Sequence, residues 1–255
     1  MRSLRLFSRP SLRLPGRVFS TALVCVATLL PLSSFGLRPT HAAGVIFHVA
    51  ATGDDNNDGS QARPFRQIGR ALAAAGPGDT VLVGDGNYLG FDLSNVEGTP
   101  SAPLTVRATG TNANVVPTTD RADNRDTMHV SFSTYVVLEG LRSSNANRAA
   151  LRVNQSHHVT VRSCVFGNNT RWGMFTNHSD DLLIENNECF GSGLEHGIYV
   201  SNSGDRPVVR RNRLHDNRGA GVQLNADLSA GGDGIISVAL VLGNLIYNNG
   251  AGGGG

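Results

Sequence analysis

A histidine and a tyrosine three residues apart, His196 and Tyr199, are the side chains of this sequence best suited to proton transfer. Histidine exchanges a proton near neutral pH, and tyrosine can act as an acid or a base beside a suitable partner. The sequence therefore predicts His196 and Tyr199 as candidate catalytic residues. The alternative is a packed, hydrogen-bonded histidine, because the equivalent positions of a repeat described below hold Ala149, Trp172 and Ala220.

A second group of candidate ligands lies in the segment DDNNDG. Asp54, Asn56 and Asp58 match the pattern D-x-N-x-D-G, which is the first half of a calcium-binding loop. The twelfth position of such a loop is Phe65, which cannot supply the closing carboxylate. Calcium is the only cofactor that the sequence suggests, and the alternative is a solvated turn rich in Asp and Asn.

Both groups belong to a chain with a strong internal repeat. The segments NRAALRVN, TRWGMFTN, LEHGIYVS and RGAGVQLN begin at residues 147, 170, 194 and 218. A second series, VVLEGLRS, VTVRSCVF, LLIENNEC, PVVRRNRL and ALVLGNLI, begins at residues 136, 159, 182, 207 and 239. Alternating apolar positions make each segment a short strand with one buried face. A period near 24 without intervening helices predicts an all-β fold, a right-handed parallel β-helix solenoid.

In such a solenoid, equivalent side chains form columns along the axis. Successive members of one column lie about 4.8 Å apart. One outward column contains Arg152, Phe175, Tyr199 and Gln223, and Asn177 lies on the same face. The aromatic rings can pack against the C–H surface of sugars, and the arginine can pair with a carboxylate. These five residues are the predicted substrate-binding residues. The alternative is an aromatic ladder that a loop covers.

Other columns have structural roles. Asn187, Asn212 and Asn244 share one position, where their amides can satisfy the backbone at the corners. Cys164 and Cys189 lie two positions and one turn apart, so we expect their Cα atoms to be roughly 8 Å apart. Disulfides rarely bridge more than about 7 Å, so the sequence predicts two free, buried thiols.

A further column alternates in charge. We interpret it as a stabilising outer ladder, with a charged substrate track as the alternative. Its members are Glu139, Arg162, Glu185 and Arg210.

The two ends of the repeat differ. Pro64–Ala75 has the pattern of an amphipathic helix, with Pro at its start and Gly76 after its end, and we expect it to cap the first turn. The expected cap covers residues 43–78 and the expected coils cover residues 79–255. No helix follows the last strand, and the chain stops in the middle of a turn on AGGGG. We therefore expect an uncapped C-terminal end and a fragment of a longer protein; the alternative is a glycine tail on a complete domain.

Residues 1–42 have the layout of a secretory signal peptide, with arginines, a short apolar run and a small-residue cleavage site. A retained anchor is the alternative. The rest of the 255-residue chain has 16 arginines, 20 acids and no lysine, a net charge of −4. This balance gives no reason to expect nucleic-acid binding. We expect a secreted or cell-surface protein that is monomeric and has no membrane span after cleavage.

Two long segments carry a family resemblance. FHVAATGDDNNDGSQARPFRQIGRALAAAGPGDTVLVGDGNY and HGIYVSNSGDRPVVRRNRLHDNRGAGVQLN resemble secreted right-handed parallel β-helix (PbH1-repeat) proteins of the pectate-lyase-like superfamily, and the similarity spans residues 46–249. Members of this superfamily include polysaccharide lyases, hydrolases, uronate epimerases and proteins without an assigned activity. The resemblance therefore implies the fold more specifically than the chemistry.

The motifs narrow the chemistry that the resemblance implies. Lyases of this type pair calcium with an arginine or lysine base, but the chain lacks lysine, and RPVVR at Arg206–Arg210 is one residue short of R-x-P-x-x-R. The N-T-D and G-H-G segments typical of the related hydrolases are absent. Uronate epimerases and related lyases use His and Tyr, which again indicates His196 and Tyr199. The sequence thus favours an exported β-helix that binds and modifies an acidic polysaccharide; the alternatives are a non-catalytic surface or adhesive β-helix, or an inactive fragment.

Overall fold

The computed structural model describes residues 44–118 and 126–252, all within one compact unit. The signal peptide expected over residues 1–42 lies outside the described residues. Within the described part of the chain, no helix has the length and apolar character needed to cross a membrane.

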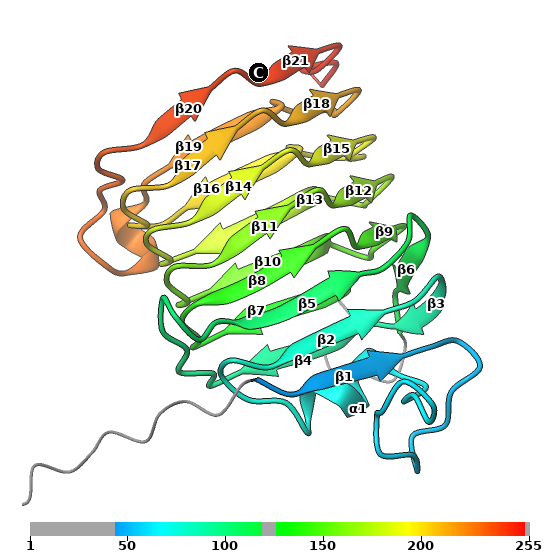
Figure 1. The fold of residues 1–255 in the computed structure, drawn as a ribbon. Coiled ribbons are helices and arrows are strands. Elements are labelled where there is room, and N and C mark those ends of the chain that lie inside the picture. Colours follow the sequence, from blue (N-terminus) through cyan, green and yellow to red (C-terminus); the bar gives the residue numbers. More distant parts are fainter. Residues whose placement is uncertain (1–43, 119–125, 253–255) are drawn as a thin grey trace, which may run out of the picture. The chain divides into compact units, whose positions relative to one another are not determined.

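The described chain forms three parallel sheets that run along one axis (Figure 1). Sheet I contains β1 (Ile46–Val49), β2 (Thr80–Val83), β5 (Leu104–Ala108), β8 (Val136–Glu139), β11 (Thr160–Arg162), β14 (Leu183–Glu185), β17 (Val208–Arg210) and β20 (Leu240–Leu242). Sheet II contains β4 (Phe91–Ser94), β7 (Met128–Ser131), β10 (Ala149–Asn154), β13 (Trp172–Asn177), β16 (Ile198–Ser201) and β19 (Val222–Asn225). Sheet III contains β3 (Gly86–Leu89), β6 (Ala113–Val116), β9 (Arg142–Ser144), β12 (Val165–Gly167), β15 (Glu188–Phe190), β18 (Arg213–His215) and β21 (Leu245–Tyr247). This arrangement confirms the predicted all-β parallel solenoid.

The predicted columns are confirmed by the strand register. Leu151 pairs with Met174, Met174 with Ile198, and Ile198 with Val222. The first three of these side chains are fully buried in the core that the sheets enclose. Because parallel strands in register repeat each position once per turn, one apolar position in the repeat fills one column of the interior.

The inward asparagines form the expected ladder. The Asn187 amide nitrogen donates to Oδ1 of Asn212 at 3.1 Å, and the Asn212 amide nitrogen donates to Oδ1 of Asn244 at 2.9 Å. Each Oδ1 also accepts the backbone N–H of the preceding asparagine, at 2.9 Å in both cases. These bonds satisfy the backbone donors at the sharp corner between sheets I and III.

The two thiols are free and buried, as predicted. Burial raises the pKa of Cys164 to about 12, and burial likewise raises the pKa of Cys189. Both side chains therefore stay as neutral, unreactive thiols at physiological pH.

The alternating charged column on sheet I forms ion pairs within the stack. Arg162 lies 2.9 Å from a carboxylate oxygen of Glu139, and Arg210 lies 2.7 Å from one of Glu185. Each arginine is thus paired with the acid one turn before it, which supports the interpretation as a stabilising ladder. The alternative role as a substrate track is untested.

The N-terminal helix is shorter than predicted. Instead of Pro64–Ala75, α1 spans Ile68–Leu72, and it contacts β1 to β4. Phe65 is extended, because its N–H donates to His48 and its carbonyl accepts from Ala50, alongside β1. The capping role of α1 stays a prediction. The first strand of sheet I is β1, so the coil begins one strand earlier than the sequence indicated.

The C-terminal end of the described stack exposes apolar side chains. Val241 and Ile246 are 45% and 47% exposed, whereas their column neighbours Val209 and Leu214 are fully buried. The described C-terminal end is therefore uncapped, as predicted.

Candidate functional site

The predicted substrate-binding column lies on the outer face of sheet II. Arg152 pairs in register with Phe175, Phe175 with Tyr199, and Tyr199 with Gln223. The structure therefore brings these four predicted residues into one line across β10, β13, β16 and β19. Gln223 is partly buried at the C-terminal end of this line.

The column continues toward the N-terminus through residues that the sequence did not suggest. Arg152 pairs with His129 of β7, and His129 pairs with Asp92 of β4. His129 Nδ1 lies 3.4 Å from a carboxylate oxygen of Asp92. The repeat is hard to find here because β4 and β7 begin 37 residues apart. The apolar alternation of Phe91 and Leu93 with that of Met128 and Val130 was the available signal.

Three aromatic rings gather on this face. Trp172 stacks on Phe175 with ring centroids 4.5 Å apart, and Tyr199 lies 5.5 Å from Phe175 and 5.9 Å from Trp172. Trp172 is 6% exposed, and its indole N–H has no hydrogen-bond partner among the described residues. Phe175 and Tyr199 are half-buried and form the accessible part of the cluster, whereas Trp172 is almost fully buried against them.

Two arginines flank the aromatic cluster, and a buried acid holds them. The Asp126 side chain is 2% exposed and pairs with both Nε and Nη2 of Arg148; the Nε distance is 2.8 Å. Nη1 of Arg152 lies 3.8 Å from the same carboxylate. Arg148 and Arg152 lie 5.7 and 5.6 Å from the Phe175 ring centre. Sequence analysis missed both residues: Asp126 lies outside every aligned segment, and Arg148, at the second position of NRAALRVN, gives no sign in the sequence of its contact with Asp126.

His196 lies next to Tyr199, but only one of its ring nitrogens can donate a hydrogen bond. Its ring is edge-on to Tyr199 at 5.4 Å between centroids, and its Nδ1 accepts the backbone N–H of Ala220 at 2.9 Å. This bond places the imidazole hydrogen on Nε2. Burial lowers the pKa of His196, and Glu195 opposes this effect. His196 is therefore a neutral donor at Nε2, and protonation at Nδ1 requires the loss of a backbone hydrogen bond.

The remaining predicted residues on sheet II form a second polar column. Asn177 donates to Asn154 at 2.7 Å and accepts from Asn202 at 2.5 Å. The Tyr199 hydroxyl accepts from the amide of Asn225 at 2.9 Å. Asn177 is thus held between Asn154 and Asn202 in a ladder. The Tyr199 hydroxyl is held by Asn225.

The predicted calcium ligands lie elsewhere, in the loop between β1 and α1. Asp54 accepts the backbone N–H of Asn56 at 2.9 Å, and Asp58 accepts that of Ser60 at 2.9 Å. The neighbouring Asp55 accepts the N–H groups of Arg66 and Gln67 ahead of α1. Within the described residues no group of three acidic, His or Cys side chains has metal-binding geometry. Calcium binding by Asp54, Asn56 and Asp58 stays an untested prediction.

Comparisons with known proteins identify the fold family. The family described as "Right handed beta helix region" matches residues 106–254, and a family of unknown function (DUF1565) matches residues 51–100. The uncharacterized protein YwoF of Bacillus subtilis (strain 168) is 25% identical over 187 residues, which cover 72% of this chain. The chain spans about a third (31%) of the length of that relative.

Solved structures of polysaccharide lyases share this fold. Pectate lyase Pel9A has a TM-score of 0.62 at 20% identity, with 72% of this chain and 50% of that chain covered. An alginate lyase from Paenibacillus sp. str. FPU-7 has a TM-score of 0.50 at 20% identity, with 69% and 72% covered. A rhamnogalacturonan lyase has a TM-score of 0.51 at 14% identity, with 79% and 51% covered. At these identities the likeness to the solved structures shows the fold alone. Because the family model for the right-handed β-helix region matches more than half of the chain, the chain belongs to that family.

Proposed function

We propose that the outer face of sheet II binds an acidic polysaccharide and modifies its uronate residues by elimination or epimerisation. The observation that carries this proposal is the aromatic cluster of Trp172, Phe175 and Tyr199 with Arg148 and Arg152 beside it. Aromatic faces pack on the C–H surface of a sugar ring, and guanidinium groups pair with carboxylates. A site with both features suits a chain of sugars that carries carboxylate groups.

The orientation of the column suits a long ligand. Successive members lie one turn apart, about 4.8 Å along the axis, so a polysaccharide aligned with the axis meets one side chain of the column per turn. Arg152, Phe175 and Tyr199 then contact neighbouring parts of the same ligand. The polysaccharide-acting proteins among the structural relatives support this choice of ligand class.

The proposed chemistry begins with proton removal from the carbon next to the uronate carboxylate. Arg152 pairs with that carboxylate and stabilises the charge that develops on it. Tyr199 accepts the proton in its deprotonated form, whose oxygen the Asn225 amide stabilises by donating a hydrogen bond to it. His196 donates from Nε2 to an oxygen of the substrate, because its Nδ1 is held by Ala220. In elimination the electron pair forms a C=C bond as the adjacent C–O bond breaks, and the leaving oxygen takes the proton from Tyr199. In epimerisation a proton from water adds to the opposite face of the same carbon.

A non-catalytic binding protein is the second candidate, and one observation favours it. His196 is neutral and accepts a backbone hydrogen bond at Nδ1, so it is a weak proton donor. Under this alternative the same aromatic and arginine residues bind the polysaccharide at a surface without turning it over. A surface or adhesive role follows from binding alone.

The cellular setting is part of the proposal. We infer export from the arginine-rich, apolar N-terminus, which agrees with an extracellular polysaccharide as the partner. We infer a monomer, with calcium as an optional ligand of Asp54, Asn56 and Asp58.

The test combines activity and binding measurements. The protein is incubated with alginate, pectate and glycosaminoglycans, with and without calcium, and ultraviolet absorbance reports the unsaturated product of elimination. Proton NMR of the alginate reports epimerisation. Catalysis predicts turnover that Tyr199→Phe reduces by at least about a hundredfold. Retardation in polysaccharide gels without turnover supports the binding protein, and neither turnover nor retardation contradicts both candidates.

A further inference from the structure

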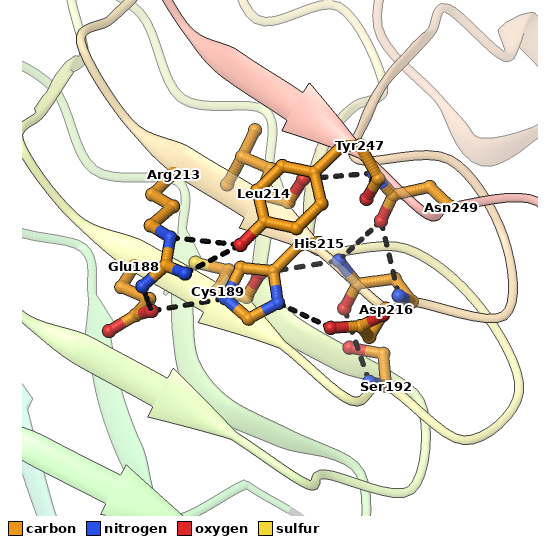
Figure 2. Close-up of polar contacts among 10 residues, drawn as sticks. Glu188, Cys189, Ser192, Arg213, Leu214, His215, Asp216, Tyr247 and Asn249 are labelled. Atoms are coloured by element: carbon orange, nitrogen blue, oxygen red, sulfur yellow. Dashed lines mark hydrogen bonds and ion pairs between the residues drawn. The ribbon is translucent and has the colours of Figure 1, made fainter.

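A second polar cluster lies on the outer face of sheet III (Figure 2). Arg213 donates from Nε and Nη2 to the Tyr247 hydroxyl at 3.0 and 2.6 Å, and from Nη1 to Oε1 of Glu188 at 2.7 Å. The same Oε1 lies 3.0 Å from Nε2 of His215, and Nδ1 of His215 lies 2.6 Å from Oδ2 of Asp216. These five side chains form one continuous network over β15, β18 and β21.

Ring stacking fixes the orientation of this network. The His215 ring lies between Phe190 and Tyr247, with centroid distances of 5.3 and 4.9 Å and interplanar angles of 4° and 5°. A Cβ atom at Gly167 would lie 2.4 Å from the Phe190 ring, so that ring lies directly over the glycine. The stack therefore holds the polar groups of His215 and Tyr247 in place without a ligand, which lowers the entropic cost of binding one.

The fold does not require these polar residues. At the same outward positions β12 has Val165 and Gly167, and β9 has Arg142 and Ser144. Those turns pair normally with their neighbours without the Glu188–Arg213–His215–Asp216 network, so the network is not needed to build this sheet. A polar network at positions where the fold accepts other residues indicates a role beyond folding.

Asp216 departs from its own column in the same way. It has a left-handed backbone with φ of 54°, which Asn and Gly tolerate best. The other members of this corner column are Asn145, Asn168, Gly191 and Asn248. Hydrogen bonding to His215 lowers the pKa of Asp216, so this carboxylate is ionised at neutral pH. The column thus has a charged acceptor in the one turn where an imidazole lies beside it.

Part of the network faces solvent with unused hydrogen-bonding groups. The side chains of Arg213 and Asp216 are 54% and 55% exposed. Arg213 uses three of its five N–H groups, and neither the other two nor the hydroxyl hydrogen of Tyr247 has a partner in the described part of the chain. The surface therefore offers fixed donors and an exposed carboxylate acceptor.

We propose that the outer face of β15, β18 and β21 is a binding site for a neutral saccharide, separate from the site on sheet II. Sugar hydroxyls donate and accept at once, so they match a surface that presents Arg213 and Tyr247 donors on the Nε2 side of the His215 ring and the Asp216 carboxylate on its Nδ1 side. Glu188 and Asp216 repel an anionic chain, in contrast to the arginine-flanked cluster of sheet II. The proposal is independent of the function proposed for sheet II.

Affinity electrophoresis of the full chain tests the site, with soluble xylan, starch and β-glucan as neutral probes and alginate as the acidic probe. We expect retardation by at least one neutral probe. Asp216→Asn should weaken that affinity by about tenfold or more, because it removes a charged acceptor while keeping a residue that suits the left-handed corner. Tyr247→Phe keeps the ring and removes the hydroxyl, and the same loss is expected.

Arg142→Gln is the matched control, because Arg142 occupies the Arg213 column three turns earlier on the same face. It should leave retardation by the neutral probe at the wild-type level, whereas Arg213→Gln should reduce it. Circular dichroism checks that each variant is folded. The proposal is overturned if no neutral probe retards the wild-type protein, or if the Arg142 and Arg213 variants lose affinity equally. Phe175→Ala on sheet II should reduce retardation by alginate and leave retardation by the neutral probe unchanged. The experiment therefore distinguishes a failure of the sheet III proposal from a failure of the sheet II proposal.

Discussion

The side-chain amide of Asn187 lies 3.1 Å from Oδ1 of Asn212, one turn further along the stack, and both residues are buried. The same oxygen accepts the backbone N–H of Asn187 at 2.9 Å. One side chain therefore satisfies two buried donors of the neighbouring turn. The stability of the solenoid depends on such bonds between turns, because each short strand has few contacts within its own turn.

Asn212→Ala should lower the free energy of unfolding by about 2–4 kcal/mol, because it leaves buried donors of Asn187 without an acceptor. Asn154→Ala is the control, since Asn154 accepts from Asn177 on the outer face, where water can replace the bond. We expect less than about 1 kcal/mol for that variant. Urea unfolding followed by circular dichroism measures both, and equal losses would contradict the role assigned to the inner ladder.

Ser192→Asn should stabilise the protein by about 1 kcal/mol. A second inner column has Asn169, Asn217 and Asn249, but Ser192 interrupts it. The buried amide nitrogen of Asn169 and the Ser192 hydroxyl have no hydrogen-bond partner among the described residues. An asparagine at position 192 would supply the amide oxygen that accepts from the Asn169 side chain.

Ser192→Ala is the control for that substitution and should change stability little, because the hydroxyl that it removes is unpaired. Thermal unfolding compares the two variants. A less stable Asn variant beside a neutral Ala variant would mean that the column has no room for the larger side chain.

Gly173→Ala should destabilise the fold by about 1–3 kcal/mol through overpacking. A Cβ atom at Gly173 would lie 2.6 Å from the carbonyl oxygen of Gly197 and 3.0 Å from Cβ of Cys189. Gly69→Ala in α1 is the matched control, because nothing lies within 4 Å of its added Cβ atom. Alanine favours a helix, so this control should be neutral or stabilising. The midpoints of urea unfolding measure both effects, and equal midpoints for the two variants would contradict the prediction.

The free energy of unfolding should decrease as the pH is lowered through the range in which His196 takes up a proton. Its pKa is lowered in the folded protein, chiefly by burial, so the unfolded state binds a proton more readily. The free energy of unfolding therefore falls as the pH decreases from about 6.5 toward the lower folded-state pKa. His196→Gln should remove this part of the pH dependence. An unchanged slope between pH 7 and pH 5 in the variant, measured by urea unfolding, would contradict the assignment to His196.

Arg152→Gln should weaken binding to alginate by about tenfold, because a neutral amide cannot replace the charged hydrogen bonds of a guanidinium. Arg107→Gln on sheet I is the control and should bind as the wild type does. Affinity electrophoresis at two salt concentrations measures the effect. A loss that is the same for both variants would indicate a general charge effect instead of a site.

Much of the fold was predictable because the repeat records it directly. The apolar positions at Leu151, Met174 and Ile198 predict the core column, and strand alternation then places Phe175 and Tyr199 in the outer one. The α1 boundaries were wrong, since backbone bonds between Phe65 and the residues around β1 override helix propensity. The ion pair of Asp126 with Arg148 was missed, because Asp126 lies outside every repeat segment and its contact with Arg148 follows no period.

The sequence by itself determined the solenoid and the columns of its regular turns from Ala149 onward, because parallel stacking converts a period near 24 residues into neighbouring turns. Only the tertiary structure decided how the side chains of the sites are held. It showed Asp126 beneath Arg148, Ala220 bonded to Nδ1 of His196, and His215 between Glu188 and Asp216. These contacts depend on rotamers and on the paths of the corners between strands, which a repeating pattern does not specify.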